Sequence, residues 1–170
     1  MMNNLRRRIE KLELRKLAAG QVSPDTVDQA LSRNPGNAEL LIRALRAERE
    51  GRELSADEFR GKQAFRQAMI QVCGSSFREG FEDAVDISKV VNYAFMWNSH
   101  SEFFIVENFE QYKEEGAVER PHVSAARQKL DAEWNRLCSM AGSPVSEGTT
   151  FTKAYFGQAK ARDLQKVGSK

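Results

Sequence analysis

The chain has 170 residues, of which 41% are apolar and 29% charged, and its formal net charge is +2. This composition is typical of a globular protein and not of a disordered one. The length allows one good hydrophobic core. A net charge this small does not by itself imply nucleic-acid binding, because dedicated nucleic-acid binders usually also show a clustered basic face.

Charge is distributed in blocks along the chain. Residues 1–20 carry six basic side chains against two acidic ones, and residues 153–170 carry five against one. Residues 74–120 hold ten acidic side chains against four basic ones, whereas the two remaining segments are each neutral. Two basic ends around an acidic middle predict a protein that docks onto charged partners.

Residues 4–19 carry apolar side chains at the spacing of a helix, with Leu5, Ile9 and Leu12 in one stripe. This spacing predicts a basic amphipathic helix within residues 1–20. Two copies of the chain that pair through the stripe would make a homodimer. Two heptads are nevertheless too few to specify a coiled coil.

The apolar stretches of the chain bear on its compartment. None reaches the roughly 18 residues of a membrane span, and no apolar segment follows Arg6, Arg7 and Arg8 as it would in a signal peptide. The two cysteines, Cys73 and Cys138, are expected to be free thiols in a reducing environment. Together these features predict a cytoplasmic protein without a membrane partner.

Residues 21–142 are expected to form a helical core domain. Ser23 precedes Pro24 in the order that favours a helix start, and Ser55 with Glu58 makes a capping box. With the helical periodicity, these signals predict helices over residues 23–33, 37–50, 55–73, 77–97 and 121–142.

The remaining segments complete the expected fold. Residues 102–112 are ambiguous, because the apolar run from Phe103 to Val106 suits a short strand or the buried part of a helix. Helical neighbours and the lack of a strand partner favour the helix. Phe59 is expected on a buried helix face, and residues 143–170 are expected to be a loop and a basic tail. The predicted fold class is all-α, a single compact domain of six or seven helices with a basic N-terminal helix and a frayed basic C-terminal tail.

The residues that most often carry chemistry are few and far apart. Cys73, His100, His122 and Cys138 are separated by 27, 22 and 16 positions, which is too far for the short ligand spacings of a structural zinc site. Cys73 is predicted at a helix C-terminus, where the helix dipole disfavours a thiolate. We therefore expect no metal, no cofactor and no catalytic residue.

Two pairs of carboxylates are the exception. Glu79 with Asp83, and Glu82 with Asp86, stand four residues apart on the predicted helix over residues 77–97, so each pair would be neighbours. Such pairs hold magnesium or share a proton in some enzymes. A solvated acidic face is the alternative interpretation.

Each end of the chain offers a positively charged element that suits phosphate groups. The candidate binding residues are Arg6, Arg7, Arg8, Lys11, Arg15, Lys16, Lys160, Arg162 and Lys166. Near the C-terminal group, Tyr155 and Phe156 place aromatic rings beside basic side chains, as in proteins that bind single strands. The alternative is that basic ends only keep the protein soluble.

The acidic middle offers a second candidate surface. Seven of the fifteen aromatic residues lie between Tyr93 and Tyr112, among regularly spaced glutamates. Exposed rings among acids would make a protein interface, and the acids would imitate a phosphate backbone. The candidate residues are Glu102, Glu107, Glu110, Tyr112, Glu114 and Glu115.

Three hypotheses about function follow. The preferred one is a non-enzymatic regulatory protein that binds nucleic acid, or a protein or nucleoprotein complex that handles one, through its basic ends. The second is an adaptor or inhibitor whose acidic and aromatic surface over residues 93–119 blocks a basic groove of a protein partner. The third is an enzyme built on the carboxylates of residues 79–86.

Overall fold

A computed structural model describes residues 23–114, 116–146 and 148–157. Over these residues the chain is all-α, as predicted, and the described part contains no strand. The basic helix predicted over residues 1–20 and the basic residues beyond 157 lie outside the described residues. The described elements are α2 (Pro24–Ser32), η1 (Pro35–Asn37), α3 (Ala38–Arg49), α4 (Ala56–Cys73), η2 (Gly74–Ser76), η3 (Phe81–Asp83), α5 (Ile87–Asn98), α6 (His100–Tyr112) and α7 (Pro121–Met140), followed by helical residues 151–157.

The chain divides into two compact units, residues 1–94 and residues 95–170. The boundary between them falls inside α5, where no glycine, proline or polar linker marks it. The core domain predicted over residues 21–142 includes parts of both units.

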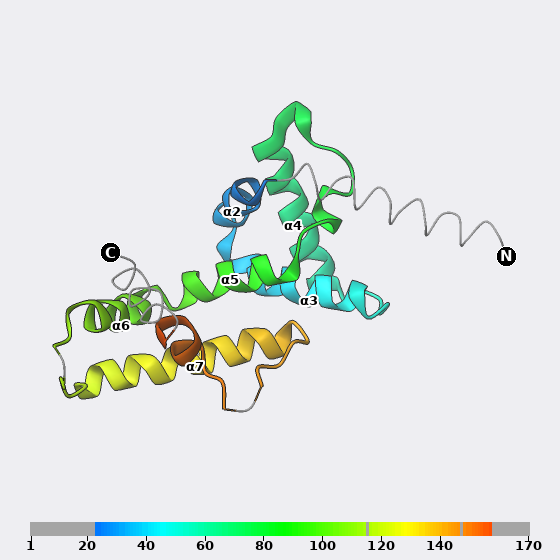
Figure 1. Cartoon of the computed structure of the whole chain (residues 1–170). Helices are drawn as coiled ribbons and strands as arrows, with labels where there is room; N and C mark the ends of the chain where they lie inside the picture. The colour runs from blue at the N-terminus through cyan, green and yellow to red at the C-terminus, as the bar shows by residue number, and fades with distance from the viewer. Residues whose placement is uncertain (1–22, 115, 147, 158–170) are drawn as a thin grey trace, which may run out of the picture. The chain divides into compact units, whose positions relative to one another are not determined.

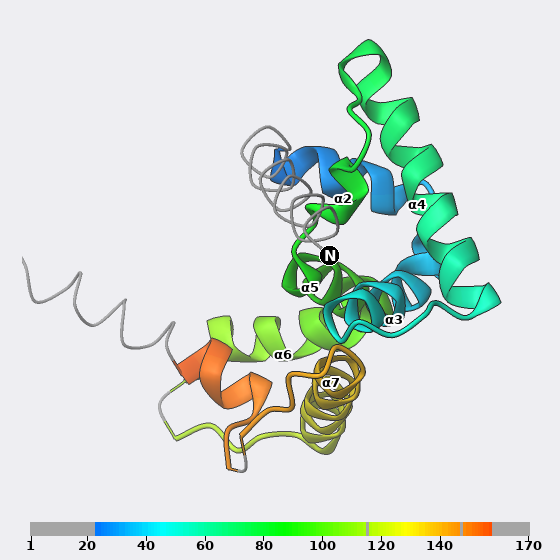
Figure 2. The ribbon, with the colours of Figure 1, turned by 90° about the vertical axis from the view of Figure 1, so that its right-hand side faces the viewer.

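In the first unit, α4 packs against α2 and α3 (Figures 1 and 2). The caps read from the sequence are present, because Ser23 caps α2 and Ser55 with Glu58 forms the capping box of α4. Leu41 and Ile42 of α3 are fully buried. Phe59 was expected to be buried, but it is 53% exposed, because the buried face of α4 is formed by Glu58, Gly61, Phe65, Ala68 and Met69.

The helix predicted over residues 77–97 is wrong in its first half. Gly80 has a φ of +89°, which an α-helix does not allow, and the chain continues as the short turn η3. The carboxylate of Asp86 accepts a 3.0 Å hydrogen bond from the backbone N–H of Ser88 at the start of α5. Asp86 therefore acts as a local cap, which the hydrophobic pattern alone did not reveal.

In the second unit, α6 lies beside α7 (Figures 1 and 2), and the helix interpretation of residues 102–112 is confirmed. Residues 151–157, which the sequence analysis placed in a loop and tail, are helical. The carboxylate of Asp131 on α7 accepts hydrogen bonds from the backbone N–H and the hydroxyl of Thr152, both of 2.9 Å. These bonds fix the last helical segment to α7.

Aromatic rings fill the core of this unit. Phe95 contacts Trp134 of α7 and Phe151, with ring centroids 5.1 and 4.4 Å apart. Phe156 is buried and its ring lies 5.7 Å from that of Phe103 on α6. The aromatic residues near the C-terminus therefore belong to the fold of the unit, since burying such rings is a large part of core stability.

Candidate functional site

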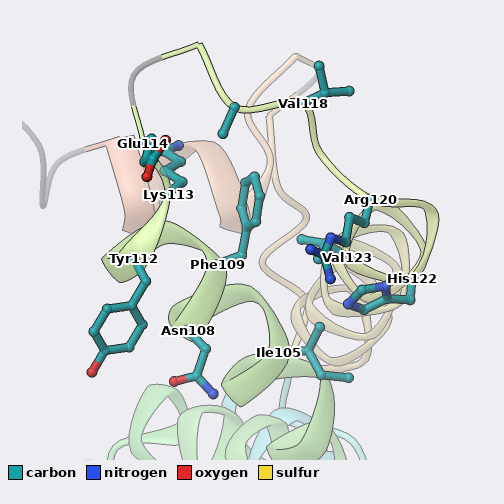
Figure 3. A pocket seen from close by; sticks show the side chains of 11 residues that line it. Ile105, Asn108, Phe109, Tyr112, Lys113, Glu114, Val118, Arg120, His122 and Val123 are labelled. Carbon is teal, nitrogen blue, oxygen red and sulfur yellow. The ribbon is translucent and has the colours of Figure 1, made fainter.

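An open groove of about 590 Å³ lies in the second unit, between α6 and the beginning of α7. Its lining comes from α6, from the connection over residues 113–120 and from the first turn of α7. The lining residues are Ile105, Asn108, Phe109, Tyr112, Lys113, Glu114, Ala117, Val118, Arg120, His122 and Val123. Figure 3 shows Phe109 between Lys113 and Glu114 on one side and the residues of α7 on the other.

Three large apolar side chains that line the groove are exposed. Ile105, Tyr112 and Val118 are 38%, 75% and 88% exposed, whereas Val123 is buried. Tyr112 points away from Phe109 in Figure 3, so its ring widens the apolar surface beyond the groove. Single exposed apolar residues are ordinary, but several in one place mark a site of interaction.

Arg127 of α7 holds the walls of this region together. Its guanidinium donates to Glu110 of α6, and its Nε donates to the carboxylate of Glu119 at 2.6 Å. Lys113 Nζ adds a second ion pair to Glu110 at 2.7 Å. Partial burial opposes ionisation of Glu110, but the bonds from Lys113 and Arg127 outweigh it, and the pKa of that carboxyl lies below its usual value.

The acidic residues predicted as a binding surface lie in different local environments. The carboxylate of Glu110 forms ion pairs with Arg127 and Lys113. The carboxylate of Glu102 lies 3.5 Å from Lys129 Nζ. Glu107 is half-buried, Glu114 is exposed on the groove, and Glu115 lies outside the described residues.

Among the described residues, the charged side chains that line the groove are Lys113, Glu114 and Arg120, with His122 beside them. Lys113 is paired with Glu110, whereas Arg120 and His122 are exposed. Arg120 was not predicted as a site residue, because residues 74–120 were interpreted by the sign of their net charge.

The candidate basic residues at both ends, from Arg6 to Lys16 and from Lys160 to Lys166, lie outside the described residues. Of the two rings next to the C-terminal group, Phe156 is buried and Tyr155 is 50% exposed. The ring of Tyr155 stacks on Phe151 with centroids 5.4 Å apart.

The carboxylate pairs proposed for an enzyme do not form as predicted, because residues 77–86 are not one α-helix. Instead, Glu82 faces Arg66, and Asp83 faces Lys62. Within the described part of the chain, no three or more histidine, cysteine or carboxylate side chains are grouped so as to hold a metal ion.

The two cysteines are free thiols. Cys73 is half-buried at the end of α4, in agreement with its predicted place at a helix C-terminus, and Cys138 is buried. Burial raises the pKa of the Cys138 thiol, which disfavours the reactive thiolate.

None of the helices in the described ranges is long and apolar enough to cross a membrane.

The fold and the groove define an all-α protein with an open apolar surface site. No protein-family model, no curated protein and no solved structure matches this chain. The interpretation of the site therefore depends on its own geometry and charge.

Proposed function

We propose that this chain is a non-enzymatic interaction protein whose groove between α6 and α7 binds an amphipathic helix of a partner protein. One observation carries the proposal, namely the apolar lining that the groove exposes. Ile105, Tyr112 and Val118 keep large apolar surfaces in contact with water. Covering them with a partner's apolar face would stabilise the complex by about 25 cal/mol for each Å² removed from water.

The charge of the groove selects the partner's polar side. Lys113 is paired with Glu110, whereas the cationic side chain of Arg120 is exposed beside the apolar residues of the groove, next to His122. We therefore infer a partner helix with acidic side chains along one edge. Apolar side chains at helical spacing on that partner would fill the groove, and its carboxylates would meet Arg120, as in other complexes of a helix in a groove.

A display library of helical peptides, selected against the full chain, tests this proposal. We expect enriched peptides with apolar residues three and four apart and with Asp or Glu on one flank. Ile105→Asp should abolish their binding, because it places a charge on the apolar surface. Phe104→Asp, an equally drastic change of an exposed ring on α6 that does not line the groove, should leave binding unchanged.

The charge argument has its own test. Arg120→Glu should turn the selection from acidic toward basic peptides, because the new carboxylate repels the original partner edge. The proposal is overturned if no peptide is enriched above the Ile105→Asp background. It is also overturned if Arg120→Glu leaves the charge of the selected peptides unchanged.

A second candidate function is binding of a nucleic acid through the basic ends. The specific observation that favours it is Tyr155, whose half-exposed ring is supported by Phe151 and precedes Lys160, Arg162 and Lys166 in the chain. An exposed ring on a rigid support offers a base a stacking surface, and neighbouring cations attract its phosphate. A salt-dependence experiment in the Discussion tests this candidate.

A further inference from the structure

The first unit contains a separate hollow of about 560 Å³ between α3, α4 and the turn η3. None of its lining residues belongs to the groove of the second unit. Its lining residues are Glu48, Leu54, Phe59, Lys62, Gln63, Arg66, Glu79, Gly80, Glu82 and Asp83. The positive φ of Gly80 lets the chain turn so that the acidic residues of η3 reach this hollow.

The charges that line the hollow do not balance. Four carboxylates face only two cations, so the lining carries a net charge of −2. Lys62 is shared between Glu48 and Asp83. Burial opposes the charged form of Lys62, but its bonds to these two carboxylates outweigh that effect and raise its pKa. Lys62 is therefore held as a cation between them.

Arg66 is shared in the same way. Its guanidinium lies 3.2 Å from Glu82 Oε1 and 3.5 Å from Glu79 Oε1. Each cation of the hollow thus serves two carboxylates, and a carboxylate can accept several charge-assisted hydrogen bonds. The cluster has unused capacity to accept bonds from a further cation.

Glu82 shows this unused capacity most clearly. The residue is only 4% exposed, and its Oε2 atom is shielded from solvent and has no hydrogen-bond partner. A buried carboxylate oxygen without a donor is costly, and an incoming donor would remove that cost. Glu82 lines the hollow, and the terminal torsion of a glutamate is soft, so its carboxylate can reorient toward an incoming donor.

One wall of the hollow is apolar. The ring of Phe59 is 53% exposed, and Leu54 lies beside it in the lining. An exposed aromatic face next to excess carboxylates suits a flat cation with an apolar stem, because a cation is attracted to the face of the ring.

We propose that this hollow binds a guanidinium group on an aliphatic stem. The planar fork of a guanidinium bonds two carboxylate oxygens at once and stacks on a ring, which a compact ammonium does not do. Glu82 and Glu79 would accept its hydrogen bonds, and its flat face would lie on Phe59. An arginine side chain of a polypeptide and a free alkylguanidine share this chemistry.

Titrations of the full chain, labelled with ¹⁵N and followed by NMR, test the proposal with three probes. N-acetyl-arginine amide should cause saturable shifts at Gly80, Phe81 and Glu82. N-acetyl-citrulline amide, which has the same shape without the charge, should cause none. Butylguanidine, which carries the same single charge, is the free alkylguanidine, and the tighter binder of the two charged probes identifies the source of the group.

Three variants complete the test. Glu82→Gln should weaken binding at least about tenfold, because a charged acceptor is lost. Phe59→Leu, which keeps an apolar side chain but removes the ring, should weaken it about threefold. Asp57→Asn, an exposed carboxylate on α4 outside the hollow, is the matched control and should change nothing.

The proposal is overturned by equal shifts with the arginine and citrulline probes, or by the absence of saturable shifts with both charged probes. Unchanged affinity in Glu82→Gln also overturns it. If Glu82→Gln does not fold, Phe59→Leu decides, because an exposed ring can be replaced without loss of the core. Unchanged affinity in that variant then overturns the proposal.

Discussion

Gly61 of α4 lies so close to Leu40 of α3 that a Cβ atom at position 61 would be 2.5 Å from the Cβ of Leu40. It would also lie 3.2 Å from the backbone carbonyl carbon of Leu40. Neither atom can give way without moving α3, since one begins a side chain and the other is backbone. The close contact of α3 with α4 therefore requires a glycine at position 61, because any larger residue would place a Cβ atom in it. Both helices contribute residues to the hollow of the first unit.

Gly61→Ala should consequently destabilise the protein. Overpacking a close contact costs about 1–3 kcal/mol, and the better helix propensity of alanine returns at most about 1 kcal/mol. We expect a net loss of about 1–2 kcal/mol in the free energy of unfolding, measured by urea denaturation. Gly36→Ala is the control, because nothing lies within 4 Å of a Cβ at that position. An unchanged or higher stability of Gly61→Ala would show that the helices can separate freely.

The capping box of α4 should make stability depend on pH. Two hydrogen bonds from Arg52 and one from the backbone N–H of Ser55 hold the Glu58 carboxylate, and lower its pKa to about 2. Because the unfolded pKa is higher, at about 4.3, the stabilisation is complete above that value and is lost as the pH falls toward 2. Glu58→Gln should therefore show a smaller loss of stability between about pH 5 and pH 2.

Urea midpoints at several pH values measure this difference. Glu79→Gln is a suitable control, because its side chain is 86% exposed, and it should keep the pH dependence of the unmodified protein. Parallel pH profiles for Glu58→Gln and the unmodified chain would contradict the assignment of this carboxylate as a pH-dependent cap.

The two thiols should react at different rates. Cys73 is half-buried, whereas Cys138 is 8% exposed and its pKa is raised by burial. With a thiol-specific chromogenic disulfide at neutral pH, we expect one fast thiol and one that reacts only after unfolding. Cys73→Ser should remove the fast phase, and Cys138→Ser the slow one. The reverse assignment would mean that the packing around Cys138 is open.

The basic residues near the N-terminus allow a quantitative test of nucleic-acid binding. Replacing Arg6, Arg7 and Arg8 by alanine removes up to three phosphate contacts, each of which changes the slope of log K against log salt by about 0.9 on duplex DNA. We expect the slope to fall by about 2.7, with an unchanged helical circular dichroism spectrum. Electrophoretic shifts over a salt series measure it.

The matched comparison replaces Glu110, Glu114 and Glu115 by glutamine, which should leave that slope unchanged or strengthen binding, because acidic charge is removed. If the unmodified protein shows no binding at low salt, direct nucleic-acid binding by this chain is refuted. The groove proposal does not depend on that result.

Local signals in the sequence determined most of the helices. Ser23 and Ser55 each accept a hydrogen bond from the backbone N–H three residues further on, so their effect is visible in the sequence itself. The apolar periodicity of α3 and α7 is local in the same sense. Residues 77–86 were wrongly predicted as part of an α-helix, because their apolar side chains have the spacing of a helical face. The positive φ of Gly80 is incompatible with an α-helix there.

Only the tertiary structure decided which charges and rings remain available to a partner. Arg127 is 8 positions from Glu119 and 17 from Glu110, so its neutralisation of both could not be predicted from net charge along the chain. Tyr155 and Phe156 are neighbours in sequence, yet one is half-exposed and the other buried. Ion pairing and burial depend on contacts between distant residues, whereas caps and helical periods depend on near ones, and the candidate sites are made of the former.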